Sequence, residues 1–293
     1  MKGIILAGGE GTRLKPLTSF TSKQLLPVFD KPMIYYPLSS LMLAGIKDFL
    51  IISSPKYINT YKELLGDGKD LGVSFSYKIQ EQPDGIAAAL AIAEGFFESY
   101  EKDEPFVFAL GDNILITDNL IDTFQVAFKE IRERNKSGSI FALEVKNPSQ
   151  FGVINFDEKG SPSEIVEKPL EPKSNWGIPG FYIYNKDVFS FIGELKRSDR
   201  GELEISDLNK LLLKKNLLHV TKFGRSTIWY DAGTIDDFYE ISSIIRNIYK
   251  RTGKSIGCLE EVAINMNYIE KADILKKINL ERSEYYEYIK NLD

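Results

Sequence analysis

Short apolar runs alternate with amphipathic stretches through the first half of the chain. The apolar runs, which are typical of β-strands, cover residues 3–7, 49–52, 73–79, 105–110 and 139–145. Between them, apolar residues recur near helical spacing at 30–44, 57–65, 84–97 and 119–134. Strands that alternate with helices predict an α/β fold with a doubly wound, mostly parallel mixed sheet.

The pattern changes after Lys146. Short strands broken by glycine and proline are expected at 152–156, 163–167 and 180–184, which favours antiparallel strands and an insertion over one end of the sheet at about 146–185. Helices at 187–195 and 204–215 and strands at 218–223 and 227–230 follow, and the chain is helical from Thr234 onward. We therefore predict an α/β domain at 1–233 and a C-terminal helical extension at 234–293.

The first predicted strand leads directly into a glycine-rich loop with the sequence GGEGTR at 8–13. Glycine lets successive backbone N–H groups turn toward one point, which attracts phosphate, and the cations Arg13 and Lys23 follow. No Lys-Ser or Lys-Thr pair follows the glycines, so the loop is not a P-loop. Leu14 stands where a dinucleotide fingerprint needs its third glycine. A plain glycine turn is the remaining alternative.

Two aspartates follow predicted strands: Asp112 comes after 105–110 and Asp231 after 227–230. Ligands of open α/β sheets bind outside the carboxyl ends of the strands. Mg²⁺ takes one or two carboxylates together with waters and phosphate oxygens, so this pair is a candidate magnesium site. The alternatives are a Gly-Asp-Asn turn for Asp112 and, for Asp231, a position before a helix cap formed by Thr234 and Asp237.

Charge and composition narrow the classes of partner. Lys and Arg number 37 against 42 Asp and Glu, with the signs interspersed, so no basic surface for a nucleic-acid polymer is expected. The single Cys258 and single His219 argue against a disulfide framework and a histidine-based metal site. No apolar run reaches the roughly 20 residues of a membrane span, and no signal peptide is recognisable, so we expect a cytoplasmic protein without a membrane partner.

Together with their neighbours, these motifs resemble the sugar nucleotidyltransferase family. Its opening pattern occupies 6–18, and its Lys-x-x-x-Pro-Val and Lys-Pro-x-Ile motifs occupy 23–28 and 31–34. Its Leu-Gly-Asp-Asn, Glu-Lys-Pro and Trp-x-Asp-x-Gly-Thr motifs stand at 110–113, 167–169 and 229–234. The resemblance runs nearly the whole chain and is closest to the short glucose-1-phosphate thymidylyltransferases.

The resemblance implies a reaction and a set of site residues. The reaction is Mg²⁺-assisted, in-line transfer of a thymidylyl group from dTTP to glucose-1-phosphate, which releases pyrophosphate. The implied catalytic residues are Arg13, Lys23 and Lys168, and the implied metal ligands are Asp112 and Asp231. The implied nucleotide contacts are Leu6, Gly8, Gly9, Gly11, Thr12, Arg13, Gln24, Gln80, Gly85 and Asp112. The implied sugar contacts are Asn113, Gly152, Glu167, Lys168, Ile178, Gly180 and Arg200.

Three alternatives stay open. UTP could replace dTTP, and two departures from the close relatives, Ala88 in place of Gln and Phe151 in place of Tyr, bear on base or sugar choice. A metal-dependent glycosyltransferase would usually carry Asp-x-Asp where this chain has Asp112-Asn113-Ile114. A non-catalytic sugar-nucleotide sensor should have lost Arg13, Lys23 or an aspartate, and all are present.

The resemblance also implies a second site between the subunits of a homo-oligomer, a tetramer in relatives. There the end product of deoxysugar biosynthesis, dTDP-rhamnose, binds. The matching positions are Asp118, Gly224, Arg225 and Asn265. Asp118 and Asn265 replace a His and an Arg, which removes two donors to a diphosphate and adds a negative charge. We therefore expect that feedback inhibition by dTDP-rhamnose is weak, or that another effector has replaced dTDP-rhamnose.

Overall fold

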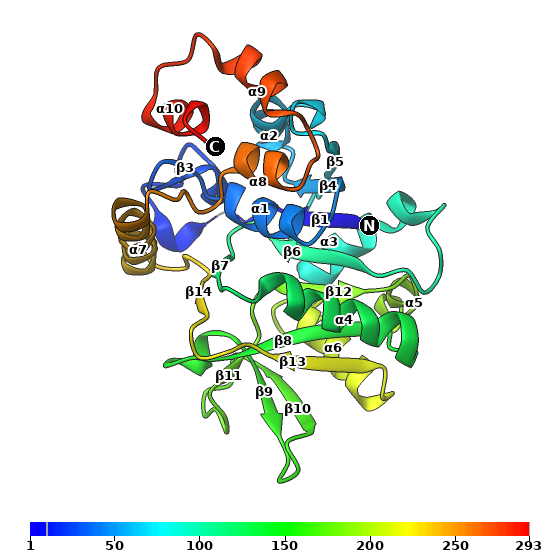
Figure 1. The fold of residues 1–293 in the computed structure, drawn as a ribbon. Helices are drawn as coiled ribbons and strands as arrows, with labels where there is room; N and C mark the ends of the chain where they lie inside the picture. The colour runs from blue at the N-terminus through cyan, green and yellow to red at the C-terminus, as the bar shows by residue number, and fades with distance from the viewer. Residues whose placement is uncertain (10, 293) are drawn as a thin grey trace.

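The computed structural model describes residues 1–9 and 11–292 (Figure 1); Glu10 of the predicted glycine loop and Asp293 lie outside the described residues. The strands are β1 (Lys2–Leu6), β2 (Pro27–Val28), β3 (Lys31–Pro32), β4 (Asp48–Ser53), β5 (Ser74–Ile79), β6 (Phe106–Leu110), β7 (Ile114–Ile116), β8 (Gly138–Glu144), β9 (Gly152–Phe156), β10 (Pro162–Glu167), β11 (Trp176–Gly177), β12 (Phe181–Tyr184), β13 (Leu218–Lys222) and β14 (Ile228–Tyr230). The helices are α1 (Tyr35–Leu43), α2 (Ile58–Leu65), α3 (Ile86–Ile92), α4 (Leu120–Arg134), α5 (Asp187–Ile192), α6 (Ile205–Lys214), α7 (Ile235–Thr252), α8 (Leu259–Asn265), α9 (Lys271–Ile278) and α10 (Glu284–Lys290).

One large mixed sheet organises the chain. Its strand order is β10-β9-β11-β8-β12-β6-β1-β4-β5, and β13 pairs with β8 as well. β1 is parallel to β4 and β6, and β4 is parallel to β5. β12 is antiparallel to both of its neighbours, β6 and β8. The predicted α/β class with a mostly parallel mixed sheet is confirmed.

Helices cover both faces of this sheet (Figure 1). Apolar side chains of α1, α2, α4 and α8, such as Leu38, Phe124 and Val262, form one buried cluster with one face. Side chains of α3, α5 and α6, such as Leu90 and Leu208, form a second cluster with the other face. Because the sheet is buried on both sides, its central strands consist almost entirely of apolar residues, which is why the sequence predicted them.

The segment at 30–44 was expected to be helical after Pro32, and α1 begins at Tyr35; the hairpin that precedes it was not predicted. Lys31 and Pro32 pair with β2 in a two-stranded hairpin, and Phe29 adopts a left-handed conformation with φ of 59° in the turn. Proline disfavours helical geometry at the residue before it, and this keeps Lys31 extended. The hairpin was not predicted because the apolar residues that follow Pro32 recur at helical spacing, which indicated only a helix.

The helix expected at 84–97 is split. α3 ends at Ile92, and Glu94–Phe97 forms a 3₁₀ helix. Gly95 lies in the second segment, where glycine is a poor α-helix former. At the start, Gly85 has φ of 107°, and a Cβ there would lie 2.4 Å from the Leu203 carbonyl oxygen, so only glycine fits this approach to the loop before α6.

Besides the β2–β3 hairpin, two short strands were not predicted, and one predicted strand lies elsewhere than expected. β7 pairs with β14, from more than a hundred residues later, and β11 has two residues, so neither shows a recognisable alternation. The strand expected at 180–184 was assigned to an insertion over one end of the sheet. Instead β12 lies inside the main sheet, between β6 and β8.

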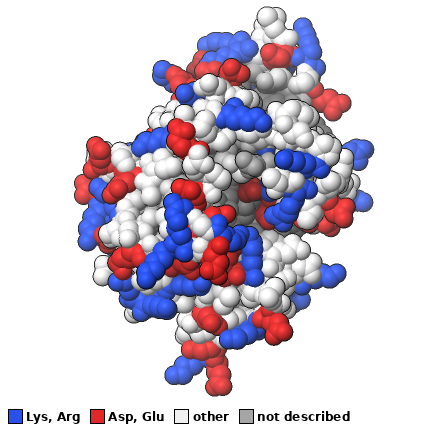
Figure 2. Space-filling view, turned by 180° about the vertical axis from the view of Figure 1, so that it is seen from behind, with Lys and Arg blue, Asp and Glu red and all other residues white. Residues whose placement is uncertain are grey.

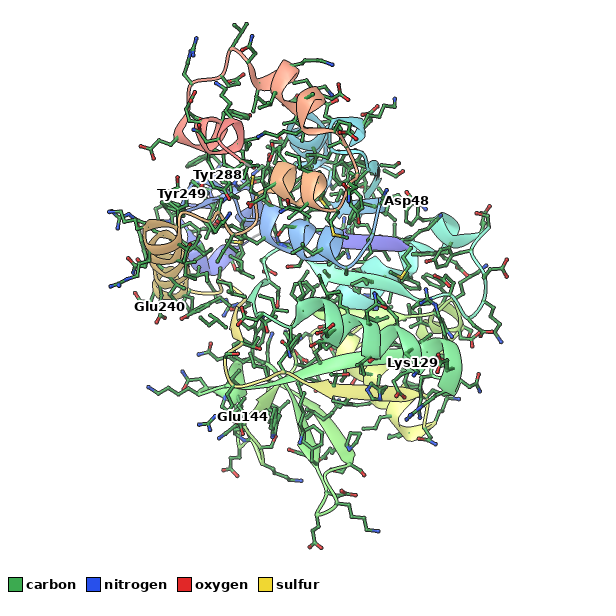
Figure 3. All side chains as sticks on the ribbon, in the orientation of Figure 1. Asp48, Lys129, Glu144, Glu240, Tyr249 and Tyr288 are labelled. Carbon is green, nitrogen blue, oxygen red and sulfur yellow. The ribbon has the colours of Figure 1, made fainter. Side chains whose placement is uncertain are left out.

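The chain after Thr234 is helical, as predicted, and forms α7, α8, α9 and α10. Tyr249 of α7 lies beside Tyr288 of α10, with ring centroids 6.0 Å apart (Figure 3). Ile289 of α10 packs with Cys258 and Ile274 in a separate small core. Among the described helices, none combines the length and apolar character needed to span a membrane. The division into a domain at 1–233 and an extension remains a prediction.

Candidate active site

The predicted site residues gather where strands of the main sheet end. The Gly111 N–H donates to the Leu6 carbonyl (2.8 Å), which joins the end of β6 to the end of β1. The Ser53 hydroxyl donates to the Ala7 carbonyl (2.8 Å) and so ties the end of β4 to the start of the glycine loop. The carboxyl ends of these parallel strands therefore meet at one edge, as an open α/β sheet requires of a binding site.

Lys23 joins the two aspartates. Its ammonium Nζ lies 2.6 Å from Oδ2 of Asp112 and donates to the Asp231 carbonyl oxygen at 2.6 Å. Lys23 is only 6% exposed, and a buried ammonium is stable only when it is paired and hydrogen-bonded. The three residues, which lie far apart in sequence, thus form one charged cluster, which we call the Lys23 cluster.

Burial raises the pKa of the Asp231 carboxyl, and the negative charge of Asp112 raises it further. Lys23, the Gly233 N–H and Arg13 act in the opposite direction. The Gly233 N–H donates to Oδ1 of Asp231 at 3.0 Å, and Arg13 Nη2 lies 3.1 Å from the position that a Cβ on Gly233 would occupy. Arg13 therefore belongs to the same cluster. Because the carboxylates of Asp112 and Asp231 repel each other, an additional cation near them would stabilise their ionised forms.

The donor set suits a divalent cation that shares its coordination with a substrate. Within 1–9 and 11–292, no three His, Cys, Asp or Glu side chains are placed to hold a metal ion. Asp112 and Asp231 alone provide two carboxylates, which is the number that Mg²⁺ takes when it keeps waters and binds phosphate oxygens. The residues fit Mg²⁺ in a phosphate complex and do not form an all-protein metal cage.

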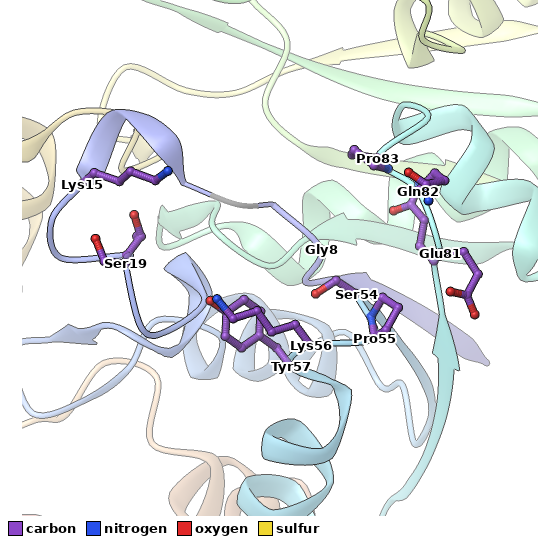
Figure 4. A pocket seen from close by; sticks show the side chains of 12 residues that line it. Gly8, Lys15, Ser19, Ser54, Pro55, Lys56, Tyr57, Glu81, Gln82 and Pro83 are labelled. Atoms are coloured by element: carbon purple, nitrogen blue, oxygen red, sulfur yellow. The ribbon is translucent and has the colours of Figure 1, made fainter.

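A cavity of about 550 Å³ opens beside the glycine loop (Figure 4). Gly8 and Gln80, both predicted to contact nucleotide, line it. The Gln80 amide nitrogen donates to the Gly85 carbonyl at 3.3 Å, and its Oε1 lies 3.3 Å from where a Cβ on Gly8 would stand. Gln24 is buried, with Oε1 bonded to the Ser22 hydroxyl (2.7 Å). This cavity has the size and the backbone lining of a small-molecule site.

Sequence reasoning missed part of this cavity. Lys15, Ser19, Lys56 and Tyr57 line it, apart from the labelled segment Glu81, Gln82 and Pro83 (Figure 4), and none was singled out. Lys15 lies two residues after Arg13, so the cluster of cations after the glycines was a usable signal. Lys56 and Tyr57 follow β4, and the rule that ligands bind after strands could have found them. The loop itself needs glycine at position 11, where φ is 60°.

A second, smaller cavity of about 130 Å³ is lined by Asp112 at the end of β6. It collects most of the predicted sugar contacts and both predicted metal ligands, namely Asp112, Asn113, Gly152, Glu167, Lys168, Ile178, Gly180 and Asp231. The Ile178 N–H donates to the Gly152 carbonyl at 2.9 Å and holds two of its walls together. The structure therefore places Gly8 and Gln80, of the predicted nucleotide contacts, at the larger cavity and most of the predicted sugar contacts at the smaller one.

Asn113 connects the two sides of this cavity. Its amide nitrogen donates to Oδ1 of Asp112 (2.9 Å), and its Oδ1 accepts from the Gly180 N–H (2.8 Å) and the Trp229 indole N–H (2.7 Å). A Cβ on Gly180 would lie 2.8 Å from the Asn113 Cγ, so glycine is required at 180. These bonds fully use the carbonyl side of the amide and leave one N–H of Nδ2 for a ligand.

The Glu167-Lys168 segment has unusual backbone geometry. Lys168 has φ of 41°, which is rare for a residue with a side chain, and its N–H donates to the Phe151 carbonyl at 3.0 Å. Such strain is found mainly at functional sites. Arg200 binds Glu204 at 2.8 Å and lies 4.0 Å from Glu167, so it stands beside the cavity without being part of its lining.

The predicted second site is only partly assembled within one chain. A hydrogen bond between the hydroxyls of Thr117 and Thr227 (3.1 Å) places the loop that carries Asp118 beside the loop that carries Gly224 and Arg225, and all three residues are exposed. Asn265 is exposed at the end of α8, on the α1 side of the sheet. The basic and acidic side chains are intermixed on the face that Figure 2 shows.

The fold and the two-sided site define a transferase of nucleotidyl groups, and comparison with known proteins agrees. The model of the nucleotidyl transferase family matches residues 2–248. The chain therefore belongs to the nucleotidyl transferase family, which confirms the predicted family and its enzymatic class. A glycosyltransferase is no longer supported.

Relatives with established names narrow the class. A glucose-1-phosphate thymidylyltransferase from Neisseria meningitidis is 44% identical over 100% of this chain and 99% of its own length. One from Mycobacterium tuberculosis is 42% identical with the same coverage. The crystal structure of a provisionally assigned glucose-1-phosphate thymidylyltransferase from Bacillus anthracis superposes with a TM-score of 0.74 at 39% identity, covering 85% of this chain and 96% of that one. A UDP-glucose pyrophosphorylase complexed with UDP-glucose gives 0.70 at 25% identity, covering 85% and 98%.

The raised pKa of Asp231 predicts that Asp231→Asn will not destabilise the protein. Because the folded state raises this pKa, the ionised carboxylate costs stability at neutral pH, and a neutral side chain of the same size removes that cost. We expect the Tm of the variant to equal or exceed that of the wild type at pH 7. The difference should shrink as the pH falls and the wild-type carboxyl becomes protonated.

Activity should move in the opposite direction, with a loss on the order of 10²-fold or more, comparable to the loss of one preorganised electrostatic group. Asp122→Asn, an exposed aspartate in the first turn of α4, is the matched control and should retain activity. Calorimetry and steady-state kinetics on both variants test this. A large drop in Tm for Asp231→Asn would show that the carboxylate is primarily structural.

Proposed function

We propose that this enzyme transfers the thymidylyl group of dTTP to glucose-1-phosphate, which yields dTDP-glucose and pyrophosphate. The observation that carries the proposal is the Lys23 cluster. Its Asp112 and Asp231 line the smaller cavity with Glu167 and Lys168, and its Lys23 lies against Gly11 of the glycine loop, which borders the larger cavity through Gly8. Two binding spaces next to one charged cluster suit a reaction that joins two phosphorylated substrates. Full-length relatives at 42–44% identity bear the corresponding name.

The reaction is an in-line displacement. A phosphate oxygen of glucose-1-phosphate attacks the α-phosphorus of dTTP, the bond to the β-phosphate bridging oxygen breaks, and pyrophosphate leaves. The nucleophile is already ionised, so no side chain has to remove a proton. The protein acts by placing the two substrates in line and by neutralising charge as the transition state forms.

Each part of the site has a role in this scheme. The glycine loop, with Leu6, Gly8, Gly9, Gly11 and Thr12, places backbone N–H groups around the triphosphate, and Arg13 and Lys23 offset its charge. Lys168 holds the phosphate of the sugar substrate, and Glu167 accepts hydrogen bonds from its hydroxyls. Asp112 and Asp231 hold Mg²⁺, which when bound supplies further neutralisation of the phosphate charge.

Gln80 and Gly85 are the residues that select the base of the nucleoside triphosphate in this proposal. The Gln80 amide and the backbone of Gly85 are joined by a hydrogen bond, and a side-chain amide presents both a donor and an acceptor to the edge of a pyrimidine. Thymine is proposed over uracil because the relatives named as thymidylyltransferases are 42–44% identical, whereas the UDP-glucose pyrophosphorylase is 25% identical. A sugar-nucleotide sensor is the weaker alternative because every proposed catalytic residue is present.

The setting of the enzyme is proposed from the same family relationship. The enzyme acts in the cytoplasm as a homo-oligomer, which is a tetramer as in its relatives. It supplies dTDP-glucose for deoxysugar synthesis, including that of dTDP-rhamnose. Support for an oligomer comes from α7, where Ile235 and Tyr239 lie one turn apart and are 41% and 61% exposed. An apolar strip of this kind on a helix suits contact with another subunit.

Purified protein should release pyrophosphate from dTTP and glucose-1-phosphate when Mg²⁺ is present. Assay of dTTP, UTP, ATP, GTP and CTP against glucose-1-phosphate, galactose-1-phosphate and glucosamine-1-phosphate measures the preference. We expect the highest kcat/KM for dTTP with glucose-1-phosphate and a loss of turnover when Mg²⁺ is chelated. Absence of pyrophosphate release with every pair would contradict the proposed function, and a preference for UTP would contradict only the assignment of the base.

We also propose that feedback inhibition by dTDP-rhamnose is weak. Asp118 adds a negative charge beside Gly224 and Arg225, where a diphosphate would have to bind, and Asn265 carries no charge. A charge-assisted hydrogen bond to phosphate contributes roughly 1.5–3 kcal/mol, so the loss of one or two weakens binding at least about tenfold.

Inhibition curves at subsaturating dTTP test this expectation. We expect little inhibition at dTDP-rhamnose concentrations below those that compete directly with dTTP, and Asp118→His together with Asn265→Arg should strengthen inhibition. Potent, non-competitive inhibition of the wild type that Arg225→Ala abolishes would show that the second site is intact and that the interpretation of Asp118 and Asn265 is wrong.

A further inference from the structure

Two buried polar side chains of α6 line the smaller cavity without using their hydrogen-bonding groups. Ser206 is 3% exposed and Asn209 is 1% exposed, and both belong to the lining of the cavity. Neither the Ser206 hydroxyl nor the Asn209 amide nitrogen has a hydrogen-bond partner among the described residues. Buried polar groups are nearly always paired, because an unpaired one costs about 1–3 kcal/mol of desolvation. Two such groups at one cavity indicate a missing partner.

The Asn209 amide is held in one orientation. The Tyr184 hydroxyl donates to Asn209 Oδ1 at 2.8 Å. Complete burial raises the pKa of Tyr184 well above its ordinary value, so this hydroxyl stays protonated and remains a donor. With the carbonyl side of the amide engaged, the group left unpaired is the Nδ2 donor. Ser206 stands three residues earlier on the same helix, which places the two side chains on one helix face.

The local fold fixes this helix face against the cavity. The Leu203 N–H donates to the Asp84 carbonyl (2.8 Å), and the Leu203 carbonyl accepts from the Ala87 N–H (3.1 Å), so the start of α6 is tied to the start of α3. Ile86 and Ile205, one from each helix, also line the cavity. The unpaired groups therefore lie on rigid elements within an otherwise apolar wall.

The cavity has room for more than one water molecule. Its volume is about 130 Å³, whereas one water needs roughly 10–15 Å³ of such space. Its other lining groups, Asn113, Glu167 and Lys168, are those assigned to the sugar phosphate. An uncharged hydroxyl both donates and accepts, so one or two ring hydroxyls can satisfy the Ser206 hydroxyl and the Asn209 N–H together.

We propose that Ser206 and Asn209 bind hydroxyl groups of the hexose ring and determine which hexose-1-phosphate the enzyme accepts. This inference rests on the proposed function, because it adds two specificity-determining residues to the proposed sugar site. A site built to hydrogen-bond a hydroxyl rejects the analogue that lacks it, since its own buried groups are then left unpaired. Ser206 and Asn209 thus contribute to discrimination among sugars more than to turnover.

Kinetics with deoxy analogues tests the proposal. We compare two variants, Ser206→Ala and Asn209→Asp, with the wild type; the second removes the amide donor at constant size. The substrates are glucose-1-phosphate and its 2-, 3-, 4- and 6-deoxy analogues. We expect each variant to raise KM for glucose-1-phosphate about tenfold, with KM for dTTP changed less than twofold. For the analogue that lacks the partner hydroxyl, wild type and variant should have equal kcat/KM.

Ser139→Ala is the matched control. Ser139 on β8 also has a buried hydroxyl without a partner, but it is not part of the cavity lining, so its variant should keep the wild-type preference among analogues. If Ser206→Ala and Asn209→Asp behave as Ser139→Ala does, or lower kcat/KM equally for every analogue, the proposal is wrong and the groups are structural or bind only water.

Wild-type turnover in the same assay reports on the proposed function separately. If no hexose-1-phosphate reacts, calorimetric binding of glucose-1-phosphate to wild type and variants decides the proposal instead, and equal affinities would overturn it.

Discussion

The ion pair and hydrogen bond that Lys23 makes hold the candidate site together. Asp112 follows β6 in the main sheet, whereas Asp231 follows β14, which pairs with β7 in a separate two-stranded sheet. Lys23 binds the carboxylate of one and the backbone of the other, across sequence separations of 89 and 208 residues. Because its ammonium is buried, loss of either contact would leave a charge unpaired in the interior. Lys23 therefore links Asp231 directly to Asp112, beside the contact of Trp229 with Asn113 and the pairing of β14 with β7.

Asn113 extends this arrangement from the aspartates to the sugar side. One amide contacts the Asp112 carboxylate, the backbone of Gly180 and the indole of Trp229, so the two predicted metal ligands and the proposed sugar pocket share a rigid support. Nothing in this cluster provides an activated nucleophile: the single Cys258 is buried in the small core of the C-terminal helices, and burial raises the pKa of its thiol to about 12. The chemistry that such a site can perform is placement and charge neutralisation, in which preorganised groups account for most of the effect.

Sequence patterns predicted the parts of this structure that are local. The apolar runs located β1, β4, β6 and β8, and the strand-end rule located Asp112 and Asp231, because both depend on residues adjacent in the chain. The resemblance to the family, which the comparisons confirm, added Glu167, Lys168 and the glycine positions that line the smaller cavity. Features set by distant contacts could not be found: the pairing of β7 with β14 and the place of β12 inside the sheet. Ser206 and Asn209 read as ordinary residues of an amphipathic helix, and only the structure shows that their polar groups lack partners.

The most direct test of the account is the stereochemistry at the transferred phosphorus. The substrate is a single diastereomer of dTTP in which sulfur replaces one non-bridging oxygen of the α-phosphate. The enzyme converts it with glucose-1-phosphate to sulfur-labelled dTDP-glucose, and ³¹P NMR determines the configuration at phosphorus in that product. A single in-line displacement, with both substrates held at the Lys23 cluster and no covalent intermediate, predicts inversion of configuration. Retention would indicate two displacements through a nucleotidylated side chain and would contradict the account.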